Sequence, residues 1–370
     1  MRVALDVSAV PVRVAGAGRY VVELARRLPG TGVATTLVAR RDDAARWRAW
    51  SSARVLDPVP RARPARLAYE ALRAGRGPLT HEVDLWHGPH YTMPRRTPLP
   101  VVVTVHDLTY FTHPEWHERA KVALFTRSIR HAAAHAAALV CVSEYTAREL
   151  ATLVAPSVPV VTAPLGVALE RFRAEPDDDA ARLDGLRLSG APAILFVGTD
   201  EPRKGLDTLL EAFAEVGDAQ AEVELWVAGQ RGWGASPIAG ALAGHRHRGR
   251  IRSLGYVEDT ALPALYRRAA VVAYPSRGEG FGLPVLEAMA CGASVVTTAD
   301  TVMAEVAGPA ARLVGAGDAV ALATALAEAL GEDAPARGAR ARVARARAEE
   351  FTWERCVARH LDAYRVALGR

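Results

Sequence analysis

Short apolar runs alternate with stretches of helical periodicity along the chain, and this alternation predicts an α/β fold. Before residue 165 the predicted strands are Val3–Val7, Ala34–Val38, Leu85–His87, Val101–Val105, Leu139–Val142 and Val158–Thr162, with helices near Arg19–Leu28, Arg119–Ala137 and Thr146–Leu153. After residue 190 they are Ala193–Val197, Glu222–Ala228, Ile251–Leu254, Val271–Tyr274 and Ser294–Thr297, with helices near Leu206–Val216, Ala261–Ala269, Pro284–Ala290 and Ala319–Leu330. Because the strands are apolar throughout rather than alternating, we expect parallel sheets covered by helices on both faces.

The alternation stops between residues 164 and 190, where Pro, Asp and Gly gather as they do in linkers. We therefore expect an N-terminal domain over residues 1–165, a linker over 166–190 and a second domain over 191–350. Two doubly wound parallel sheets that face each other across a cleft are the simplest architecture, with ligands bound at the carboxyl ends of the strands. The apolar residues of Trp353–Leu368 recur at helical spacing and predict a last helix docked on a domain.

The composition narrows the class of protein. Of the 370 residues, 50% are hydrophobic and 24% are charged, which excludes a disordered or fibrous chain. No apolar run is long enough to span a bilayer, and the first ten residues fit a strand better than a secretory signal. Cys141, Cys291 and Cys356 are too far apart in sequence for a disulfide framework or a metal cluster, so we expect a reducing, cytoplasmic compartment.

The net charge of +5 is unevenly distributed. Residues 1–165 hold 22 Lys and Arg against 13 Asp and Glu, whereas residues 166–370 hold 24 against 28. A basic half can attract anionic lipid, nucleic acid or a phosphorylated substrate, or it can simply keep the protein in solution. The arginine-rich segment 60–77, which contains Leu67, Tyr69 and Leu72, can lie peripherally on an anionic membrane or form an ordinary exposed helix. Both interpretations remain open.

The first candidate ligand site is the pair Gly16 and Gly18, between the first strand and the first helix. Glycines allow close backbone approach, and N–H groups at a helix start favour a phosphate. A nicotinamide-binding fingerprint would need a third glycine at Val21 and an acidic residue after the second strand, which ends in Arg40 and Arg41 instead. We therefore expect no nicotinamide, and an ordinary tight turn remains an alternative.

A second candidate is His106, which the strand Val101–Val105 delivers to its carboxyl end. The alternative is that His106 and Asp107 only cap the loop that follows. The other histidines near strand ends match no metal-binding spacing, and we interpret them as structural or acceptor-side residues; they are His87, His90 and His113.

The third candidate, Gly198–Gly205, directly follows the first strand of the second half and contains Arg203 and Lys204. Adjacent cations at this position are unfavourable unless an anion lies between them, and cations at a helix start oppose the helix dipole. Arg supplies a planar fork for phosphate oxygens and Lys a point charge. A phosphate-binding role is therefore favoured over a solvated charge pair.

The fourth candidate is Ser276–Gly292, after the strand Val271–Tyr274. Pro284 suits the first position of a helix, so Gly280–Leu283 would form a turn whose N–H groups point at a ligand. Glu279 precedes this turn, and Glu287 follows it within the helix. One carboxylate can therefore face a sugar while the other accepts hydrogen bonds from two ribose hydroxyls. A glycine-rich structural turn with a surface glutamate would leave the apolar-flanked Glu287 unexplained.

Glu279 and Glu287, with seven residues between them, resemble the signature of the retaining GT-B glycosyltransferases of family four, in its mannosyltransferase-like branch. The stretch Glu201–Gly205, the pair His106–Asp107, Gly16–Tyr20, Val142–Thr146 and Pro164–Val167 follow in that family's order. Relatives often have Asn at Gly205 and Pro at Ala304. The resemblance implies two Rossmann-like domains, an N-terminal one for the acceptor, a C-terminal one for the nucleotide sugar, and a final helix, 351–370, that returns to the first domain.

The resemblance also implies roles for the candidate residues. Glu287 would bind the ribose, Glu279 would lie beside the donor sugar, and Arg203 and Lys204 would hold the diphosphate. Gly16 and Gly18 would lie near the diphosphate or near the acceptor, and His106 would lie at the reacting sugar. The expected catalytic residues are thus Arg203, Lys204, Glu279 and His106, and the expected donor-binding residues are Gly16, Gly18, Gly198, Gly280, Phe281, Gly282, Leu283 and Glu287.

The expected reaction is transfer of a hexose, with GDP-mannose or a UDP-hexose as donor and a glycan or lipid-linked acceptor. Departure of a nucleoside diphosphate builds negative charge that fixed cations can stabilise. The letters Asp177–Asp179 match the metal-binding Asp-x-Asp motif of other transferases, but we interpret them as a solvated helix cap in the linker. We therefore expect no cofactor and no metal.

Two other functions remain to be weighed. A nucleotide-sugar epimerase shares the two-domain architecture and would need no acceptor. A basic module for nucleic acid would need aromatic platforms, whereas aromatic residues make up only 6% of the chain and are scattered, so we expect no nucleic-acid partner.

Overall fold

The computed structural model describes every residue except 13, 15, 177 and 230–236. Its contacts divide the chain into two compact units. Unit 1 comprises Met1–Gly166 together with Trp353–Arg370, and unit 2 comprises Val167–Thr352. Residues 167–190 therefore belong to unit 2, where the guanidinium of Arg267 binds the carboxylate of Asp179 and the backbone carbonyl of Arg173.

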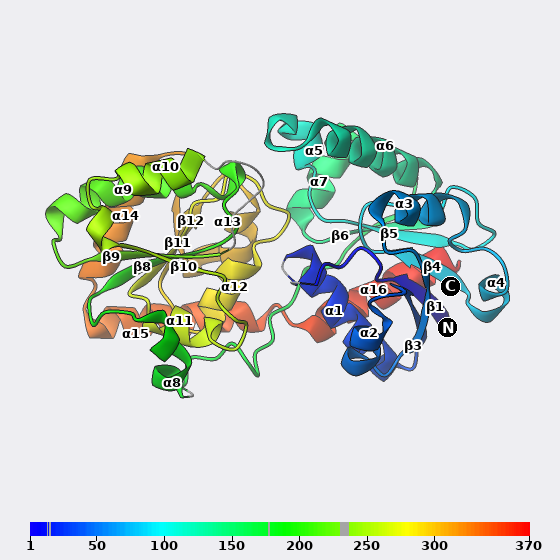
Figure 1. Cartoon of the computed structure of the whole chain (residues 1–370), viewed down its shortest axis with the longest axis horizontal. Coiled ribbons are helices and arrows are strands. Elements are labelled where there is room, and N and C mark those ends of the chain that lie inside the picture. The colour runs from blue at the N-terminus through cyan, green and yellow to red at the C-terminus, as the bar shows by residue number, and fades with distance from the viewer. Residues whose placement is uncertain (13, 15, 177, 230–236) are drawn as a thin grey trace. The chain divides into compact units, whose positions relative to one another are not determined.

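Unit 1 contains a seven-stranded parallel sheet in the order β3-β2-β1-β4-β5-β6-β7 (Figure 1). Its strands are β1 (Arg2–Asp6), β2 (Ala34–Arg40), β3 (Arg54–Val59), β4 (Leu85–Gly88), β5 (Val101–Val105), β6 (Ala138–Cys141) and β7 (Val160–Thr162). The strand order reverses between β1 and β4, and ligands of doubly wound sheets bind outside the carboxyl ends at such a point.

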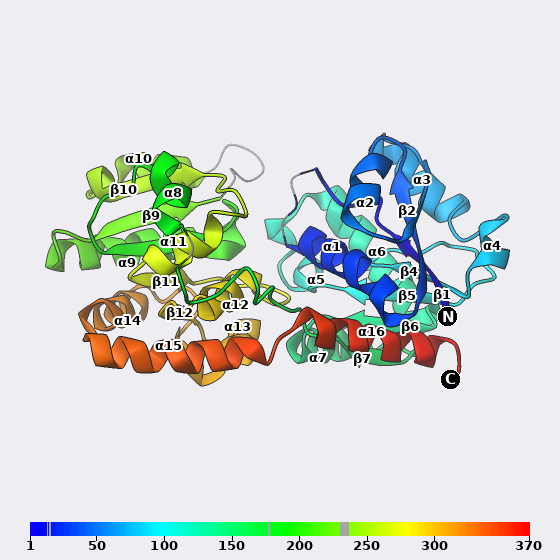
Figure 2. The same cartoon turned by 90° about the horizontal axis from the view of Figure 1, so that it is seen from below.

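The helices of unit 1 are α1 (Ala17–Arg27), α2 (Ala44–Trp50), α3 (Arg63–Leu72), α4 (Leu79–Glu82), α5 (Thr109–Thr112), α6 (Arg119–His135), α7 (Glu144–Leu153) and α16 (Trp353–Ala367). One apolar core joins α6 and α7 to Ala4, Trp86 and Val103 of the sheet. Helix α16, drawn in red, packs along α1 and strands β5 to β7 (Figure 2). Helix α16 therefore belongs to the same compact unit as the N-terminal strands.

Unit 2 contains a six-stranded parallel sheet in the order β10-β9-β8-β11-β12-β13. Its strands are β8 (Ala193–Val197), β9 (Glu224–Ala228), β10 (Ile251–Gly255), β11 (Val271–Tyr274), β12 (Val295–Thr298) and β13 (Arg312–Val314). Its helices are α8 (Asp179–Leu183), α9 (Leu206–Ala219), α10 (Pro237–Gly244), α11 (Leu262–Arg268), α12 (Leu283–Ala290), α13 (Val302–Ala307), α14 (Ala319–Gly331) and α15 (Ala334–Glu349). Helices α9 and α14 share an apolar core with Ile194, Phe196 and Ala273. The order reverses between β8 and β11.

The predicted fold class, two doubly wound parallel-sheet domains, is confirmed, and each predicted strand is present within two residues of its expected bounds. Strands β3 and β13 were not predicted. Both are edge strands with mixed burial, and β3 contains Pro58, so neither has a continuous apolar run. Helix α15 was not predicted because its buried residues are only Ala344 and Ala348. Within the described residues, no helix is both long and apolar enough to cross a membrane.

A buried chain of hydrogen bonds attaches α16 to the sheet of unit 1. The His360 Nε2 lies 2.7 Å from the Tyr20 hydroxyl, which lies 2.8 Å from the Thr104 hydroxyl. The Thr104 oxygen lies 2.8 Å from His87 Nε2, and His87 Nδ1 lies 2.8 Å from the Tyr364 hydroxyl. All five side chains are inaccessible to solvent. Each of these groups must therefore find its partner within the chain.

One carbonyl determines every proton position in this chain of hydrogen bonds. His360 Nδ1 lies 2.7 Å from the Cys356 carbonyl oxygen, which can only accept, so Nδ1 carries the proton and Nε2 accepts from Tyr20. Tyr20 then accepts from Thr104, and Thr104 accepts from His87 Nε2. His87 Nδ1 is left to accept from Tyr364. Both imidazoles are neutral in this arrangement, and a proton added to either would face a hydroxyl that already donates to that nitrogen.

We predict that acid destabilises unit 1 through these imidazoles. Burial lowers the pKa of His360 to about 4 and that of His87 well below its usual value, so the unfolded chain binds protons first below pH about 6.5. The stability is complete above that pH, and each imidazole should remove up to about 1.4 kcal/mol per pH unit as the pH falls. Urea unfolding of the wild type and His360→Gln between pH 8 and pH 5 measures this loss. A difference between the two proteins that stays constant with pH would contradict the prediction.

Candidate active site

Two of the predicted motifs meet at the switch point of the unit 2 sheet. Because β8 and β11 are parallel neighbours, the loops that leave their carboxyl ends lie side by side. The backbone N–H of Arg277 donates to the carbonyl of Arg203 at 2.7 Å, and the Ser276 hydroxyl donates to the same oxygen at 2.9 Å. The sequence separates these residues by more than seventy positions, and the strand order brings them together.

The backbone at Gly205 explains why glycine stands there. It has φ +71°, a left-handed conformation that L side chains rarely adopt, and a Cβ at this position would collide with the carbonyl oxygen of Pro275. Gly205 follows the short 3₁₀ turn Pro202–Lys204 and precedes α9. The close approach of the two loops at Gly205 and Pro275 fixes the direction in which Lys204 leaves the backbone.

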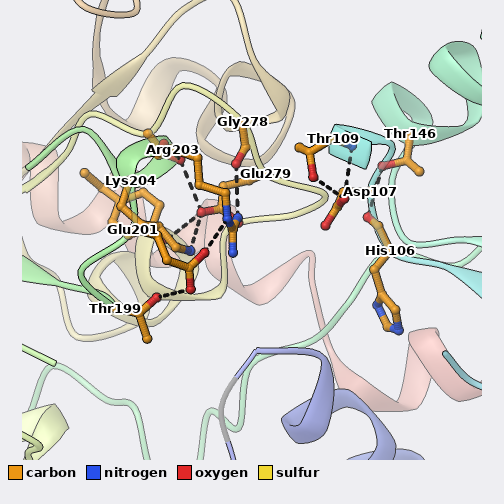
Figure 3. A network of polar contacts seen from close by, with 12 residues as sticks. His106, Asp107, Thr109, Thr146, Thr199, Glu201, Arg203, Lys204, Gly278 and Glu279 are labelled. Carbon is orange, nitrogen blue, oxygen red and sulfur yellow. Dashed lines mark hydrogen bonds and ion pairs between the residues drawn. The ribbon is translucent and has the colours of Figure 1, made fainter. Parts of the chain in front are cut away.

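Arg203, Lys204 and Glu279 form one ionic cluster (Figure 3). Arg203 Nη1 donates to Glu279 Oε2 at 2.8 Å and to the Gly278 carbonyl at 3.1 Å, and its Nε donates to Glu201 Oε2 at 2.7 Å. Lys204 Nζ donates to Glu279 Oε1 and, at 2.9 Å, to the Tyr274 hydroxyl. The anion between the two adjacent cations is thus a side chain of the protein itself.

The positive and negative charges of this buried cluster compensate one another. Burial raises the pKa of Glu279, but Arg203 and Lys204 outweigh this effect and hold its pKa at about 2. Burial also raises the pKa of Glu201, but Arg203, the Thr199 hydroxyl and Lys204 together outweigh this effect, so the pKa of Glu201 is lowered. The pKa of Lys204 is lowered by burial and by Arg203, although Glu279 opposes both. Two cations therefore face two ionised carboxylates, and the cluster is close to neutral.

The glycine-rich turn leads from this cluster into α12. Gly282 has φ +101° and precedes Leu283, the first residue of the helix, one position earlier than predicted. Phe281 and Leu283 are almost fully buried, and the chain at Gly280 is buried as well. Pro284 has no N–H, and the Val285 N–H donates to the Gly282 carbonyl at 3.1 Å, so the Leu283 N–H is the group at the start of α12 that is placed to receive an anion.

Glu287 lies one turn further along α12 and is half-buried. The buried Tyr266 hydroxyl donates to its Oε2 at 3.2 Å. Gly198 follows β8, and its N–H donates to the Ala228 carbonyl at 2.9 Å. Its own carbonyl lies so close to Gly229 that a Cβ there would collide with it. The predicted donor-binding residues of the second half therefore cluster around the ends of β8 and β11.

In unit 1, His106 follows β5 as predicted and is 7% exposed. Its Nε2 donates to the Pro89 carbonyl at 2.8 Å, and burial lowers its pKa, so the imidazole is neutral and Nδ1 bears a lone pair. Asp107 Oδ1 accepts from the backbone N–H of Thr109 at 3.1 Å and from its hydroxyl at 2.7 Å. Asp107 thus caps the loop, whereas His106 keeps an acceptor atom for another partner (Figure 3).

The remaining predicted positions have separate surroundings. Gly16 has φ +48° and precedes α1, and a Cβ there would meet open space, whereas Gly18 is an ordinary buried residue of α1. His87 belongs to the buried hydrogen-bond chain of α16. His90 packs against Tyr91 and His106, and His113 stacks on Trp116 and contacts Glu115 at 3.1 Å.

The interpretation of Asp177–Asp179 as a helix cap needs correction. Asp177 lies outside the described residues. Asp178 precedes α8 in a left-handed conformation and its side chain accepts no capping hydrogen bond. Asp179 lies in the first turn, where its carboxylate pairs with Arg267, and Arg267 also attaches it to the Arg173 carbonyl. In the described part of the chain, no group of three or more His, Cys, Asp and Glu side chains is arranged to hold a metal ion.

Sequence reasoning did not single out four residues that complete the candidate site. Tyr274 donates to Glu279 Oε1 at 3.0 Å, and the Ser276 hydroxyl lies 3.2 Å from the same oxygen. Glu201 binds Arg203, and Tyr266 binds Glu287. Tyr274 and Ser276 lie five and three positions before Glu279 in the sequence. The signal that could have indicated them is a polar residue at the end of an apolar strand. Nothing in the sequence indicates the pairing of Tyr266 with Glu287.

Comparisons with known proteins define the class. The model for glycosyltransferase family 4 matches residues 14–171, and the model for glycosyl transferases group 1 matches residues 191–332. An O-antigen chain mannosyltransferase B of Escherichia coli is 33% identical over 284 residues, which are 76% of this chain and 74% of that protein. A phosphatidyl-myo-inositol mannosyltransferase of Mycolicibacterium smegmatis is 34% identical over 216 residues, 56% of this chain and 52% of that protein.

Solved structures agree on the fold. Sucrose-phosphate synthase of Thermosynechococcus elongatus matches with a TM-score of 0.79 and 22% identity over 98% of both chains. WaaG, a glycosyltransferase of lipopolysaccharide biosynthesis, matches with a TM-score of 0.77 and 18% identity over 97% of this chain and 98% of that one. The protein is therefore a glycosyltransferase with the GT-B fold. It belongs to glycosyltransferase family 4, as the sequence motifs predicted.

Proposed function

We propose that the protein transfers a hexose, in the first instance mannose from GDP-mannose, to a glycan or glycolipid acceptor, with retention of configuration and without a metal. The relatives described above are mannosyltransferases by name, which supports the choice of sugar. A structural neighbour, HepE of Anabaena, is solved with UDP and glucose, so a UDP-hexose is the second candidate donor. A two-substrate transfer is favoured over an epimerase because the relatives are transferases.

The observation that supports this proposal most is the pair Arg203 and Lys204 at the switch point of unit 2. When the bond between the sugar and the diphosphate breaks, negative charge grows on the leaving phosphate. Each well-placed donor can lower that barrier by about 3 kcal/mol. An ammonium has three N–H donors, and Glu279 and Tyr274 accept two of those of Lys204. The third can therefore reach a phosphate oxygen without breaking the cluster.

Glu279 has two tasks in this proposal. It neutralises Arg203 and Lys204 while the site holds no donor, so that the buried cations are stable. It also lies directly before the turn into α12, so its carboxylate can face the hexose while the turn receives the diphosphate. Glu287, one turn along the same helix, would accept hydrogen bonds from the ribose hydroxyls, with Tyr266 holding its carboxylate in place.

We predict that nucleoside diphosphates bind through Glu287. Thermal shifts with UDP, GDP, ADP and dTDP, alone and as their sugars, should show stabilisation by one base in preference to the others, with GDP expected first. Glu287→Ala removes the ribose contact and should lower the affinity at least tenfold, about 1.4 kcal/mol. Glu305→Ala, a carboxylate of neighbouring α13, is the control. If no nucleotide stabilises the wild type, the donor assignment is wrong.

We predict that Lys204→Ala lowers turnover about 10²-fold or more, because the leaving phosphate loses a fixed cation. Lys121→Ala, which removes the chain's other lysine, is the matched control. Release of nucleoside diphosphate should depend on added acceptor, should persist in EDTA, and should form a product of unchanged anomeric configuration by NMR. Conversion of the donor into an epimeric nucleotide sugar without acceptor, and without net release of nucleoside diphosphate, would favour the epimerase, and loss of activity in EDTA would contradict metal independence.

We also propose that the outer face of α3 contacts anionic membrane, where a lipid-linked acceptor would be found. Leu72 is 65% exposed, and the exposed arginines Arg61, Arg73 and Arg76 flank the helix. We predict co-sedimentation with anionic vesicles at low salt, loss at high salt, and weaker binding for Leu72→Asp. Absence of binding to anionic vesicles would contradict the membrane contact and would leave the transfer reaction unaffected.

A further inference from the structure

The switch point of unit 1 contains a polar cluster that the proposed chemistry does not use. Strands β1, β4 and β5 are adjacent in the sheet, and their carboxyl ends lead to Asp6, His90 and His106. Helix α3 adds Arg66 and Glu70, which are four residues apart and share a helix face. A polar strip thus runs from Asp6 toward His106 along the edge of the sheet at which doubly wound domains bind ligands.

Asp6 and Glu70 are two buried carboxylates with few partners. Asp6 is 8% exposed and Glu70 is 7% exposed. Asp6 Oδ1 accepts from the Ser8 backbone N–H at 2.9 Å, and Glu70 Oε1 accepts from the Thr92 hydroxyl. Among the described residues neither carboxylate has a cation within ion-pair distance. Glu279, by contrast, forms ion pairs with both Arg203 and Lys204.

Among the described residues, no charge fully compensates this pair. Burial raises the pKa of Glu70 to about 7, and the neighbouring Asp6 adds to the effect, whereas Arg66 and Thr92 only partly oppose it. Burial likewise raises the pKa of Asp6. Two carboxylates kept close together in the interior lower the stability of the fold, and such pairs are typical of functional sites.

Two further buried polar atoms of unit 1 have no partner among the described residues. Trp86 is opposite Ala4 in the strand register, so it lies on the same sheet face as Asp6, one pleat away. Its indole Nε1 is buried and, within the described residues, donates to nothing; His90 Nδ1 is likewise buried without a partner. Donors and acceptors are therefore both unused on this face. No three of the described Asp, Glu and His side chains are arranged for a metal ion, so the group lacks the ligands of a cation site.

A sugar ring has the complementary chemistry. Each hydroxyl of a vicinal diol both donates and accepts, so it can donate to a carboxylate and accept from an indole or guanidinium N–H. Half-buried Arg66 and Tyr69 lie beside the pair, at the rim of the cluster. We propose that Asp6 and Glu70, with Trp86 and His90, form the subsite of unit 1 that binds a sugar ring of the acceptor. This inference rests on the proposed transfer function and adds to it the residues that recognise the acceptor.

The test uses the full chain with Glu70→Gln and Asp6→Asn, and Glu82→Gln and Asp57→Asn as controls at exposed carboxylates of the same unit. The probes are the methyl glycosides of mannose, glucose, galactose and N-acetylglucosamine, and the readout is saturation-transfer NMR. At least one glycoside should bind the wild type and the controls. Binding should weaken at least tenfold in the two subsite variants, while the thermal shift with nucleotide stays unchanged.

Melting temperature separates a binding role from a structural one. Each subsite variant removes a buried, uncompensated charge and should melt at or above the wild-type temperature at pH 8, because the folded protein no longer holds two nearby carboxylates. A structural pair would instead lose stability on either substitution. Glycoside binding that survives both variants, or no glycoside binding in a wild type that binds nucleotide, overturns the subsite alone. A wild type that binds no nucleotide would contradict the proposed function instead.

Discussion

The candidate active site depends on the neutralisation of two adjacent cations by one carboxylate. Arg203 and Lys204 follow β8, and Glu279 follows β11, so the ion pairs tie together the two loops of the switch point. Removing one partner of a buried ion pair typically costs about 3–5 kcal/mol, because the remaining charge has no solvent and no counterion. The same contact therefore holds the two loops in place and neutralises the adjacent cations.

The backbone supports this arrangement at points where a side chain would not fit. Gly205 in its left-handed conformation allows its loop to touch the Pro275 carbonyl, and Gly282 makes the turn into α12. A looser contact at Gly205 would move Lys204 away from Glu279 and Tyr274. The glycines thus allow the charged and polar groups to stay close together, which matters because ion pairs and hydrogen bonds weaken steeply once their atoms separate.

Much of this could be predicted from the sequence, and the limits have physical causes. Buried parallel strands have continuous apolar runs, so the central strands of both sheets were found, whereas the edge strands β3 and β13 lack that signal. The motifs around Arg203 and Glu279 were found because charge beside glycine at a strand end is unusual. That Glu279 itself neutralises Arg203 and Lys204 was not predicted, because only the strand order shows that the two loops are neighbours.

Unit 1 contains two buried polar groups of residues that differ in how fully they are satisfied. In the hydrogen-bond chain from Tyr364 to His360, every proton has one acceptor, and such networks serve to specify and stabilise a packing arrangement. Around Asp6 and Glu70, carboxylate, indole and imidazole atoms are left with unused capacity. In the proposed subsite, the hydroxyls of a sugar would supply the partners that the indole of Trp86 and the imidazole of His90 do not find among the described residues.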